Sequence, residues 1–112
     1  MNVLVIGGNG MMGPWVVPAL AARHRLLVTD VNQAPPNAAF EYRQLDVADA
    51  EAVGEAAAGM DAIVNLSVMR HDRELAFDVN VRGNCNLARA AVRHGVRRIV
   101  NTGPHNQVIG GY

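Results

Sequence analysis

Apolar residues along the chain fall into short continuous runs, separated by longer segments with helical spacing. The first run, Val3–Ile6, stops at a glycine cluster, as expected for a strand that is covered on both faces of a sheet. A looser alternation over Phe40–Leu45 predicts a less buried strand. Together the runs predict five strands, over residues 3–6, 26–29, 40–45, 61–66 and 97–101.

Three of the intervening segments have the spacing of amphipathic helices. We predict a helix over about 11–23, a second one after the N-cap Asp49 with Met60 on its apolar side, and a third over about 73–94. Gly95 follows the third helix at the position of a C-terminal cap. The apolar spacing in this helix predicts a buried face formed by Val81, Cys85, Ala88 and Val92.

The alternation of strands and helices indicates the fold class. Strands that are separated by helices pair in parallel through right-handed crossovers. We therefore expect an α/β fold with a doubly wound parallel sheet of about five strands in the order 3-2-1-4-5. With 112 residues, of which 50% are hydrophobic, the chain has the apolar material for one domain, which spans residues 1–112.

Charge and cysteine content exclude several classes of function. Ten acidic and ten basic residues cancel, which removes the positive charge typical of proteins that bind nucleic acids or anionic membranes. The single cysteine, Cys85, rules out an internal disulfide and fits a reducing compartment. The histidines lack metal-ligand spacing, and no apolar stretch is long enough to span a membrane. We expect a cytoplasmic domain with no metal site and no nucleic-acid or membrane partner.

The segment Gly7–Gly13 carries the most specific signal in the chain. Its glycines fit both G-x-G-x-x-G, starting at Gly8, and G-x-x-G-x-x-G, starting at Gly7. Glycine permits a tight turn, close approach of a pyrophosphate to the backbone, and close packing of the next helix. Because the segment follows a strand and opens a helix, it predicts a dinucleotide-binding loop, with a structural glycine turn as the alternative.

An acidic residue stands at the end of the second predicted strand. A carboxylate at Asp30 can accept hydrogen bonds from the hydroxyl groups of the adenosine ribose. The same negative charge repels the 2′-phosphate of NADP. Asp30 therefore favours NAD as the cofactor, while Arg25 and Arg43 in the neighbouring segments keep NADP as the alternative.

With these residues the chain resembles the extended short-chain dehydrogenase/reductase family, of the NAD-dependent epimerase/dehydratase type. Four segments carry the resemblance: Gly7–Gly13, Leu45–Asp49, Asp61–Ser67 and Asn80–Leu87. The last of them is similar to the family's Asn-Val-x-Gly-Thr-x-Asn-Leu helix. The similarity covers nearly all of this chain but the front part of a typical member, so it implies an N-terminal Rossmann domain that binds NAD(P).

The resemblance also implies roles for residues outside the glycine loop. Asp46 corresponds to an aspartate that bonds the adenine amino group, and the Val47 amide to one that contacts the ring. Residues 66–68 line the middle of the cofactor, although serine and valine replace the usual alanine or glycine pair. Asn80 corresponds to a helix asparagine near the nicotinamide end. The expected cofactor-binding residues are Gly7, Asn9, Gly10, Met11, Met12, Gly13, Asp30, Val31, Asn32, Asp46, Val47, Leu66, Ser67, Val68 and Asn80.

The chain departs from the family pattern at the catalytic end. After the fifth strand the family usually has a Ser-Ser run and then Val-Tyr-Gly. Counting from either side of that segment places Thr102 or His105 at the position of the catalytic serine or threonine. The chain has no lysine and no Tyr-x-x-x-Lys pair, in which a nearby cation lowers the tyrosine pKa for acid–base catalysis. We therefore expect no catalytic activity from this chain alone.

Two functional interpretations remain open. In the first, the chain is the NAD-binding portion of a longer epimerase/dehydratase-like oxidoreductase that acts on a nucleotide sugar. In the second, it is a stand-alone or degenerate NAD(P)-binding module without redox catalysis. For the longer protein the resemblance implies a homodimer, in which the helix over about 73–94 forms half of a four-helix bundle with a partner helix from beyond Tyr112.

Overall fold

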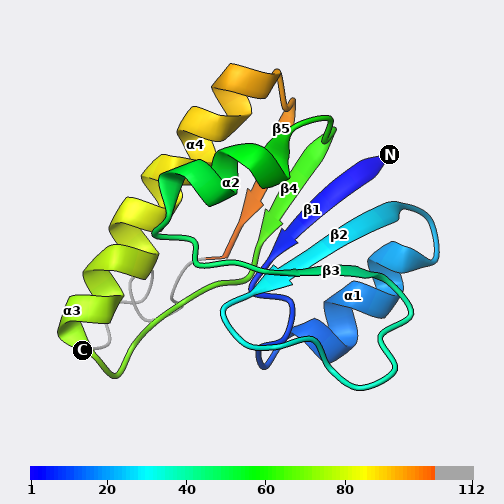
Figure 1. The fold of residues 1–112 in the computed structure, drawn as a ribbon, viewed down its shortest axis with the longest axis horizontal. Coiled ribbons are helices and arrows are strands. Elements are labelled where there is room, and N and C mark those ends of the chain that lie inside the picture. The colour runs from blue at the N-terminus through cyan, green and yellow to red at the C-terminus, as the bar shows by residue number, and fades with distance from the viewer. Residues whose placement is uncertain (103–112) are drawn as a thin grey trace, which may run out of the picture.

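The computed structural model describes residues 1–102, which form a five-stranded sheet covered by helices (Figure 1). The strands are β1 (Asn2–Ile6), β2 (Arg25–Asp30), β3 (Glu41–Gln44), β4 (Ala62–Asn65) and β5 (Arg98–Asn101). All neighbouring strands pair in parallel, in the order β3-β2-β1-β4-β5. Both the fold class and the strand order predicted from the sequence are confirmed.

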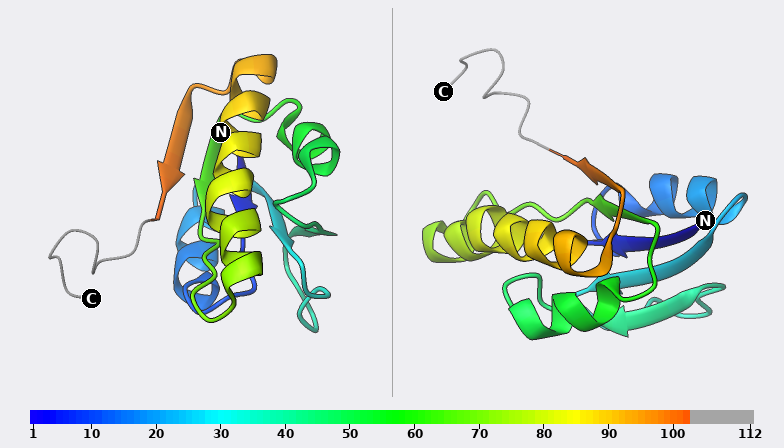
Figure 2. Two further views of the ribbon diagram at one scale, coloured as in Figure 1. Left: turned by 90° about the vertical axis from the view of Figure 1, so that its left-hand side faces the viewer. Right: turned by 90° about the horizontal axis from the view of Figure 1, so that it is seen from above.

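Helices lie on both faces of the sheet (Figure 2). One face is covered by α1 (Gly13–Ala21), and the other by α2 (Ala50–Ala57) together with α4 (Gly83–His94). Before α4 the chain forms α3 (Arg73–Ala76) and a π-helical segment of six residues, η1 (Phe77–Arg82), so that these three elements make one continuous helical rod. No helix in the described part of the chain is long and apolar enough to cross a membrane.

The side chains of β1, near the middle of the sheet, alternate between two apolar clusters. Leu4 and Ile6 belong to the cluster beneath α2 and α4, whereas Val3 and Val5 belong to the cluster beneath α1. Each of the four is at most 2% exposed. A strand that is buried on both faces needs apolar residues at every position, which explains the continuous run in the sequence.

The predicted buried face of the last helix is wrong. Val81 and Val92 are 48% and 85% exposed, and Cys85 and Ala88 are exposed as well. The stripe with the clearest apolar spacing therefore points away from the sheet. The residues of α4 that are buried lie on the opposite side of the helix, and they are Gly83, Asn86, Leu87, Ala90 and Ala91.

Close packing explains why small and polar residues occupy the inner face of α4. A Cβ atom added at Gly83 would lie 2.8 Å from Val47 Cγ1, closer than real Cβ atoms approach their neighbours. Asn86 is buried, and its Nδ2 donates a 2.9 Å hydrogen bond to the Val47 carbonyl oxygen. The helix thus packs closely on the segment after β3 because Gly83 has no side chain and the Asn86 amide is hydrogen-bonded. Neither residue is apolar and large, so neither contributes to the hydrophobic pattern of the sequence.

This orientation of α4 predicts opposite results for two truncations on one helix. Leu87 is 1% exposed, so Leu87→Ala should lower the free energy of unfolding by about 3 kcal/mol, through lost burial and the cavity left behind. Val92→Ala should change it by less than about 0.5 kcal/mol, because the side chain is already in water. Urea unfolding followed by circular dichroism measures both values. Equal losses in the two variants would contradict the observed orientation.

Candidate functional site

The carboxyl ends of β1, β2 and β4 bring three segments to one edge of the sheet (Figure 1). These segments are the glycine loop of residues 7–13, the segment 31–33 after β2, and the segment 66–72 after β4. The strand order reverses direction between β1 and β4, and α/β sheets bind ligands in the crevice at such a switch point. Residues 1–102 contain no cluster of three or more His, Cys, Asp or Glu side chains that could hold a metal ion.

Two glycines hold the loop close to its neighbours. Gly7 has a φ angle of +75°, and a Cβ atom there would lie 2.7 Å from the backbone nitrogen of Ser67. A Cβ atom at Gly13 would overlap the carbonyl oxygen of Gly8, so α1 begins directly against the loop. Both positions therefore exclude any side chain, for steric reasons that involve backbone atoms.

The outer part of the glycine loop faces solvent, as a phosphate-binding loop requires. Asn9, Gly10 and Met11 are exposed, and Met12 is 46% exposed. The loop also stands at the start of α1, where backbone amides and the helix dipole favour a negative charge. A glycine-rich turn that is exposed at a helix N-terminus fits the pyrophosphate of a dinucleotide.

Asp30 connects the glycine loop to the segment after β2. Its side chain is only 8% exposed and accepts hydrogen bonds at both oxygens. The Asn9 amide donates to Oδ2 at 3.0 Å, and the backbone and side-chain nitrogens of Asn32 both donate to Oδ1 at 3.1 Å. Asp30 thus lies next to the glycine loop, as predicted from its position at the end of the second strand.

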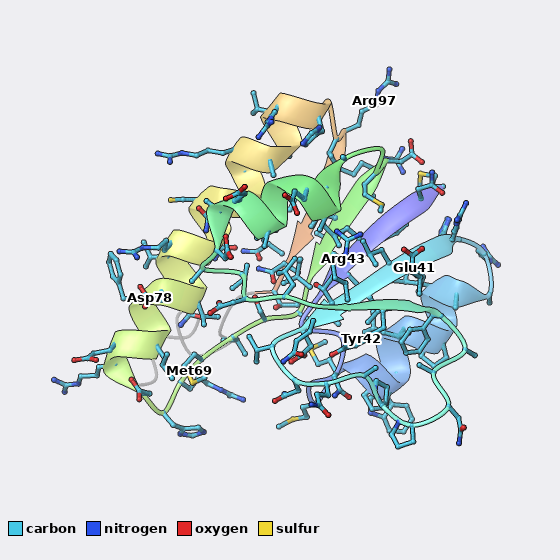
Figure 3. All side chains as sticks on the ribbon, viewed as in Figure 1. Glu41, Tyr42, Arg43, Met69, Asp78 and Arg97 are labelled. Atoms are coloured by element: carbon cyan, nitrogen blue, oxygen red, sulfur yellow. The ribbon has the colours of Figure 1, made fainter. Side chains whose placement is uncertain are left out.

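Tyr42 and Gln44 of β3 also contact this region, and the sequence did not single them out. The Tyr42 hydroxyl donates a 2.6 Å hydrogen bond to the Asn32 carbonyl oxygen, and Gln44 Nε2 donates a 2.7 Å bond to the Val31 carbonyl oxygen. Figure 3 labels Tyr42 beside Glu41 and Arg43 on the same strand. Burial and the charge of Asp30 both raise the pKa of Tyr42, so its hydroxyl stays protonated and donates throughout the neutral range.

Asp46 and Val47 follow β3 at the same edge of the sheet. Asp46 is exposed, and its Oδ1 accepts a 2.9 Å hydrogen bond from the Ala48 amide, which fixes the turn before α2. Val47 is 4% exposed and packs beneath α4. The structure therefore places the carboxylate of Asp46 at the surface while its neighbour anchors the segment.

The segment after β4 is held to the helical rod by Asn80. Oδ1 of Asn80 accepts a 3.1 Å hydrogen bond from the Met69 amide, and Nδ2 donates a 2.7 Å bond to the Met69 carbonyl oxygen. Met69 lies on this segment below the rod in Figure 3. Leu66 is 9% exposed and Val68 is 43% exposed, while the backbone of Ser67 between them lies against Gly7 of the glycine loop. The direct contact of Asn80 with a cofactor stays a prediction.

A buried asparagine that the sequence did not single out joins the ends of β4 and β5. Asn65 is 1% exposed, and its Nδ2 donates to Oδ1 of Asn84 at 3.1 Å and to Oδ1 of Asn101 at 2.7 Å. Its own Oδ1 accepts bonds from the amide and the hydroxyl of Ser67 at 3.1 and 2.6 Å. The signal in the sequence was a polar residue at the end of an apolar run, which identifies a position but not its partners.

Of the two catalytic candidates, one lies in the described residues. The Thr102 hydroxyl donates a 3.0 Å hydrogen bond to the Asn65 carbonyl oxygen, and the Thr102 amide donates to the same oxygen at 3.2 Å. Thr102 is thereby fixed at the carboxyl end of β5, next to the exit of β4. His105 lies outside the described residues.

Comparison with known proteins shows the family. The profile of the NAD dependent epimerase/dehydratase family matches residues 3–109. The chain belongs to this family. NAD is the cofactor in the family's description, so the predicted cofactor and the predicted resemblance are both confirmed.

Curated members of the family are similar to this chain over almost all of it. The chain is 36% identical over 124 residues to the 3 beta-hydroxysteroid dehydrogenase/Delta 5-->4-isomerase of Mycobacterium tuberculosis, which covers 98% of this chain and 33% of the relative. It is 31% identical over 127 residues to the UDP-glucose 4-epimerase of Mycolicibacterium smegmatis. This alignment covers 98% of this chain and 41% of the relative. The chain thus spans between a third and two-fifths of these relatives.

Solved structures give the same result. Uronate dehydrogenase from Agrobacterium tumefaciens superposes with a TM-score of 0.81 and 36% identity, over 91% of this chain and 40% of that one. A mutant of that enzyme, solved in complex with NAD, matches with the same values. The epimerase/dehydratase fold of residues 1–102 is therefore shared with NAD-bound enzymes.

The environment of Tyr42 predicts its behaviour at high pH. The phenol should ionise above the ordinary tyrosine pKa of about 10, because burial and Asp30 disfavour the phenolate. The stability that its hydrogen bond contributes is present below about pH 10 and is lost as the pH rises through the raised pKa, since the phenolate cannot donate.

Ultraviolet absorbance of the phenolate follows this titration. The difference between the titrations of the unmodified chain and of Tyr42→Phe isolates the transition of Tyr42, which should lie above the ordinary value. If the titration curve of the unmodified chain kept a single transition at the ordinary pKa, the described environment of Tyr42 would be wrong.

Proposed function

We propose that this chain binds NAD along the carboxyl edge of its sheet, as the cofactor-binding portion of an epimerase/dehydratase-type oxidoreductase. The observation that carries the proposal is the position of Asp30, whose carboxylate accepts hydrogen bonds from Asn9 in the glycine loop and from Asn32 after β2. These bonds use about three of the four acceptor sites of a carboxylate. One site is left for a ribose hydroxyl.

Each part of the dinucleotide has its own residues in this proposal. Residues 30–32 hold the adenosine ribose, while Asp46 and the amide of Val47 contact the adenine. Residues 66–68 line the middle of the cofactor, and Asn80 lies near its nicotinamide end. The pyrophosphate is held by the backbone amides of the glycine loop, which comprises Gly7, Asn9, Gly10, Met11, Met12 and Gly13.

NAD would supply the hydride acceptor for a substrate carbon that carries a hydroxyl group. The residues of this chain bind and orient the dinucleotide, and Asp30 selects the cofactor without a 2′-phosphate. Within the chain, Thr102 and His105 are the candidates for the position of the family's catalytic serine or threonine. For the whole protein we propose a nucleotide sugar as substrate, which the similarity to a UDP-glucose 4-epimerase supports.

Residues 1–112 act in this proposal as the NAD-binding domain of a longer protein that forms a homodimer. An apolar stripe on the helical rod supports the dimer. This outer stripe consists of Phe77, Val81, Cys85, Ala88 and Val92, and each of these residues is exposed. Ile99 and Val100 on β5, one of the two edge strands of the described sheet, are 42% and 58% exposed and are further apolar surface.

Cofactor titration tests the NAD site directly. If NAD binds the folded chain alone, a hundredfold excess over Kd should raise the free energy of unfolding by about 2.7 kcal/mol. Asp30→Ala should weaken NAD by at least about tenfold, because each hydrogen bond to a charged acceptor contributes roughly 1.5–3 kcal/mol. Calorimetric titration and thermal melts measure both effects.

NADP serves as the control ligand for Asp30. Asp30→Ala should leave NADP binding unchanged or improve it, because the repulsion of the 2′-phosphate is removed. A melt of the unmodified chain that neither cofactor shifts would refute the NAD site. A native preference for NADP would refute the role of Asp30.

Self-association tests the outer stripe. We expect the chain to associate at micromolar concentration, and Val92→Gln should weaken this association by making the stripe polar. Arg89→Gln, on the same helix beside the stripe, is the matched control and should leave association unchanged. Light scattering of the purified proteins measures the mass. A monomer of 12.0 kDa for the unmodified chain would exclude the stripe as an interface of this domain.

A further inference from the structure

We infer that Tyr42 and Gln44 on β3 are positioning residues that set the preference of the site for a free ribose 2′-hydroxyl. The inference rests on the proposed function, because it concerns the adenosine ribose of the same NAD site. Neither side chain belongs to the glycine loop or to the set of residues expected to contact the cofactor. Their position is defined instead by the strand that pairs with β2, where Gln44 lies opposite Asp30 in the parallel register.

Three consecutive carbonyl groups after Asp30 are each held by a side chain. Gln44 Nε2 donates to the Val31 carbonyl oxygen at 2.7 Å, and the Tyr42 hydroxyl donates to that of Asn32 at 2.6 Å. Asn9 Nδ2, from the glycine loop, donates to the carbonyl oxygen of Gln33 at 3.2 Å. The segment 31–33 is therefore held by side chains from two other parts of the chain, namely the glycine loop and β3.

The restraint by Tyr42 reaches Asp30 through Asn32, whereas Gln44 holds Val31, the residue between the two. Asn32 is held on its carbonyl side by Tyr42, while its backbone and side-chain nitrogens both donate to Oδ1 of Asp30 at 3.1 Å. A shift of Asn32 therefore moves two of the donors that orient the carboxylate. Asp30 accepts a ribose hydroxyl in one orientation of its oxygens, so the geometry of the acceptor depends on the phenol of β3.

The same arrangement affects the two cofactors differently. A 2′-hydroxyl donates to a carboxylate and gains from an acceptor that is held in place, whereas a 2′-phosphate is repelled by it. If the segment 31–33 is loosened, the 2′-hydroxyl no longer meets a fixed acceptor, and the charge of Asp30 can move away from a 2′-phosphate. Discrimination between the cofactors should therefore fall when either side chain on β3 loses its donor.

Calorimetric titration of the full chain with three ligands tests the inference. Tyr42→Phe should weaken NAD about fivefold, the effect of one hydrogen bond, and should leave NADP within about twofold. An NAD analogue that lacks the 2′-hydroxyl of the adenosine ribose is the third ligand. The unmodified chain should bind it clearly more weakly than NAD, and Tyr42→Phe should reduce this difference.

Two further variants complete the design. Gln44→Met removes the other donor of β3 at nearly constant side-chain length, and it should reproduce the loss of discrimination. The double variant with Tyr42→Phe should lose less NAD binding free energy than the sum of the losses in the two single variants, because both residues act on one segment. Glu41→Gln is the control, since Glu41 is exposed at the opposite end of the same strand.

The outcomes separate this inference from the proposed function. If the unmodified chain bound neither cofactor, the NAD site itself would be wrong. If it bound NAD but both β3 variants weakened NAD, NADP and the analogue by equal factors, the two residues would be structural and the inference would be overturned. A loss confined to NAD, with Glu41→Gln behaving like the unmodified chain, supports it.

Discussion

The buried carboxylate of Asp30 is the interaction on which the site depends. A charged group with little solvent contact is costly unless it is hydrogen-bonded, and here the protein supplies three N–H donors. One donor belongs to the glycine loop and two belong to the segment after β2. The need to satisfy one carboxylate therefore fixes two loops that lie more than twenty positions apart in the sequence (Asn9 and Asn32).

Much of this arrangement could be predicted because it follows from local rules. Apolar runs identified the buried strands, and glycine spacing with an acid at the end of β2 identified the loop and its partner. The helix cap at Asp49 was also correct, since its Oδ1 accepts hydrogen bonds from Glu51 and Ala52 at 3.1 Å. In each case the residues that determine the local structure are neighbours in the sequence or are separated by a characteristic number of residues.

The features that could not be predicted all depend on residues from distant elements. The inner face of α4 is set by Val47, which accepts a side-chain donor and leaves no space for a Cβ atom at Gly83. Asn65 is buried because Asn84 and Asn101 meet it from another helix and another strand. Such polar contacts carry no periodic signal, and apolar periodicity alone pointed to the wrong face of the helix.

The contact between Gly7 and Ser67 also bears on how the protein is made. The two residues are sixty positions apart, yet the backbone of the loop rests against the backbone after β4 with no room for a side chain. During synthesis the glycine loop therefore leaves the ribosome long before the surface that supports it. Contacts between distant segments form late, since the loop that joins them has to be closed first. The cofactor-binding edge is thus completed only after β4 has docked beside β1, and a nascent chain shorter than this has no shaped site to offer the nucleotide.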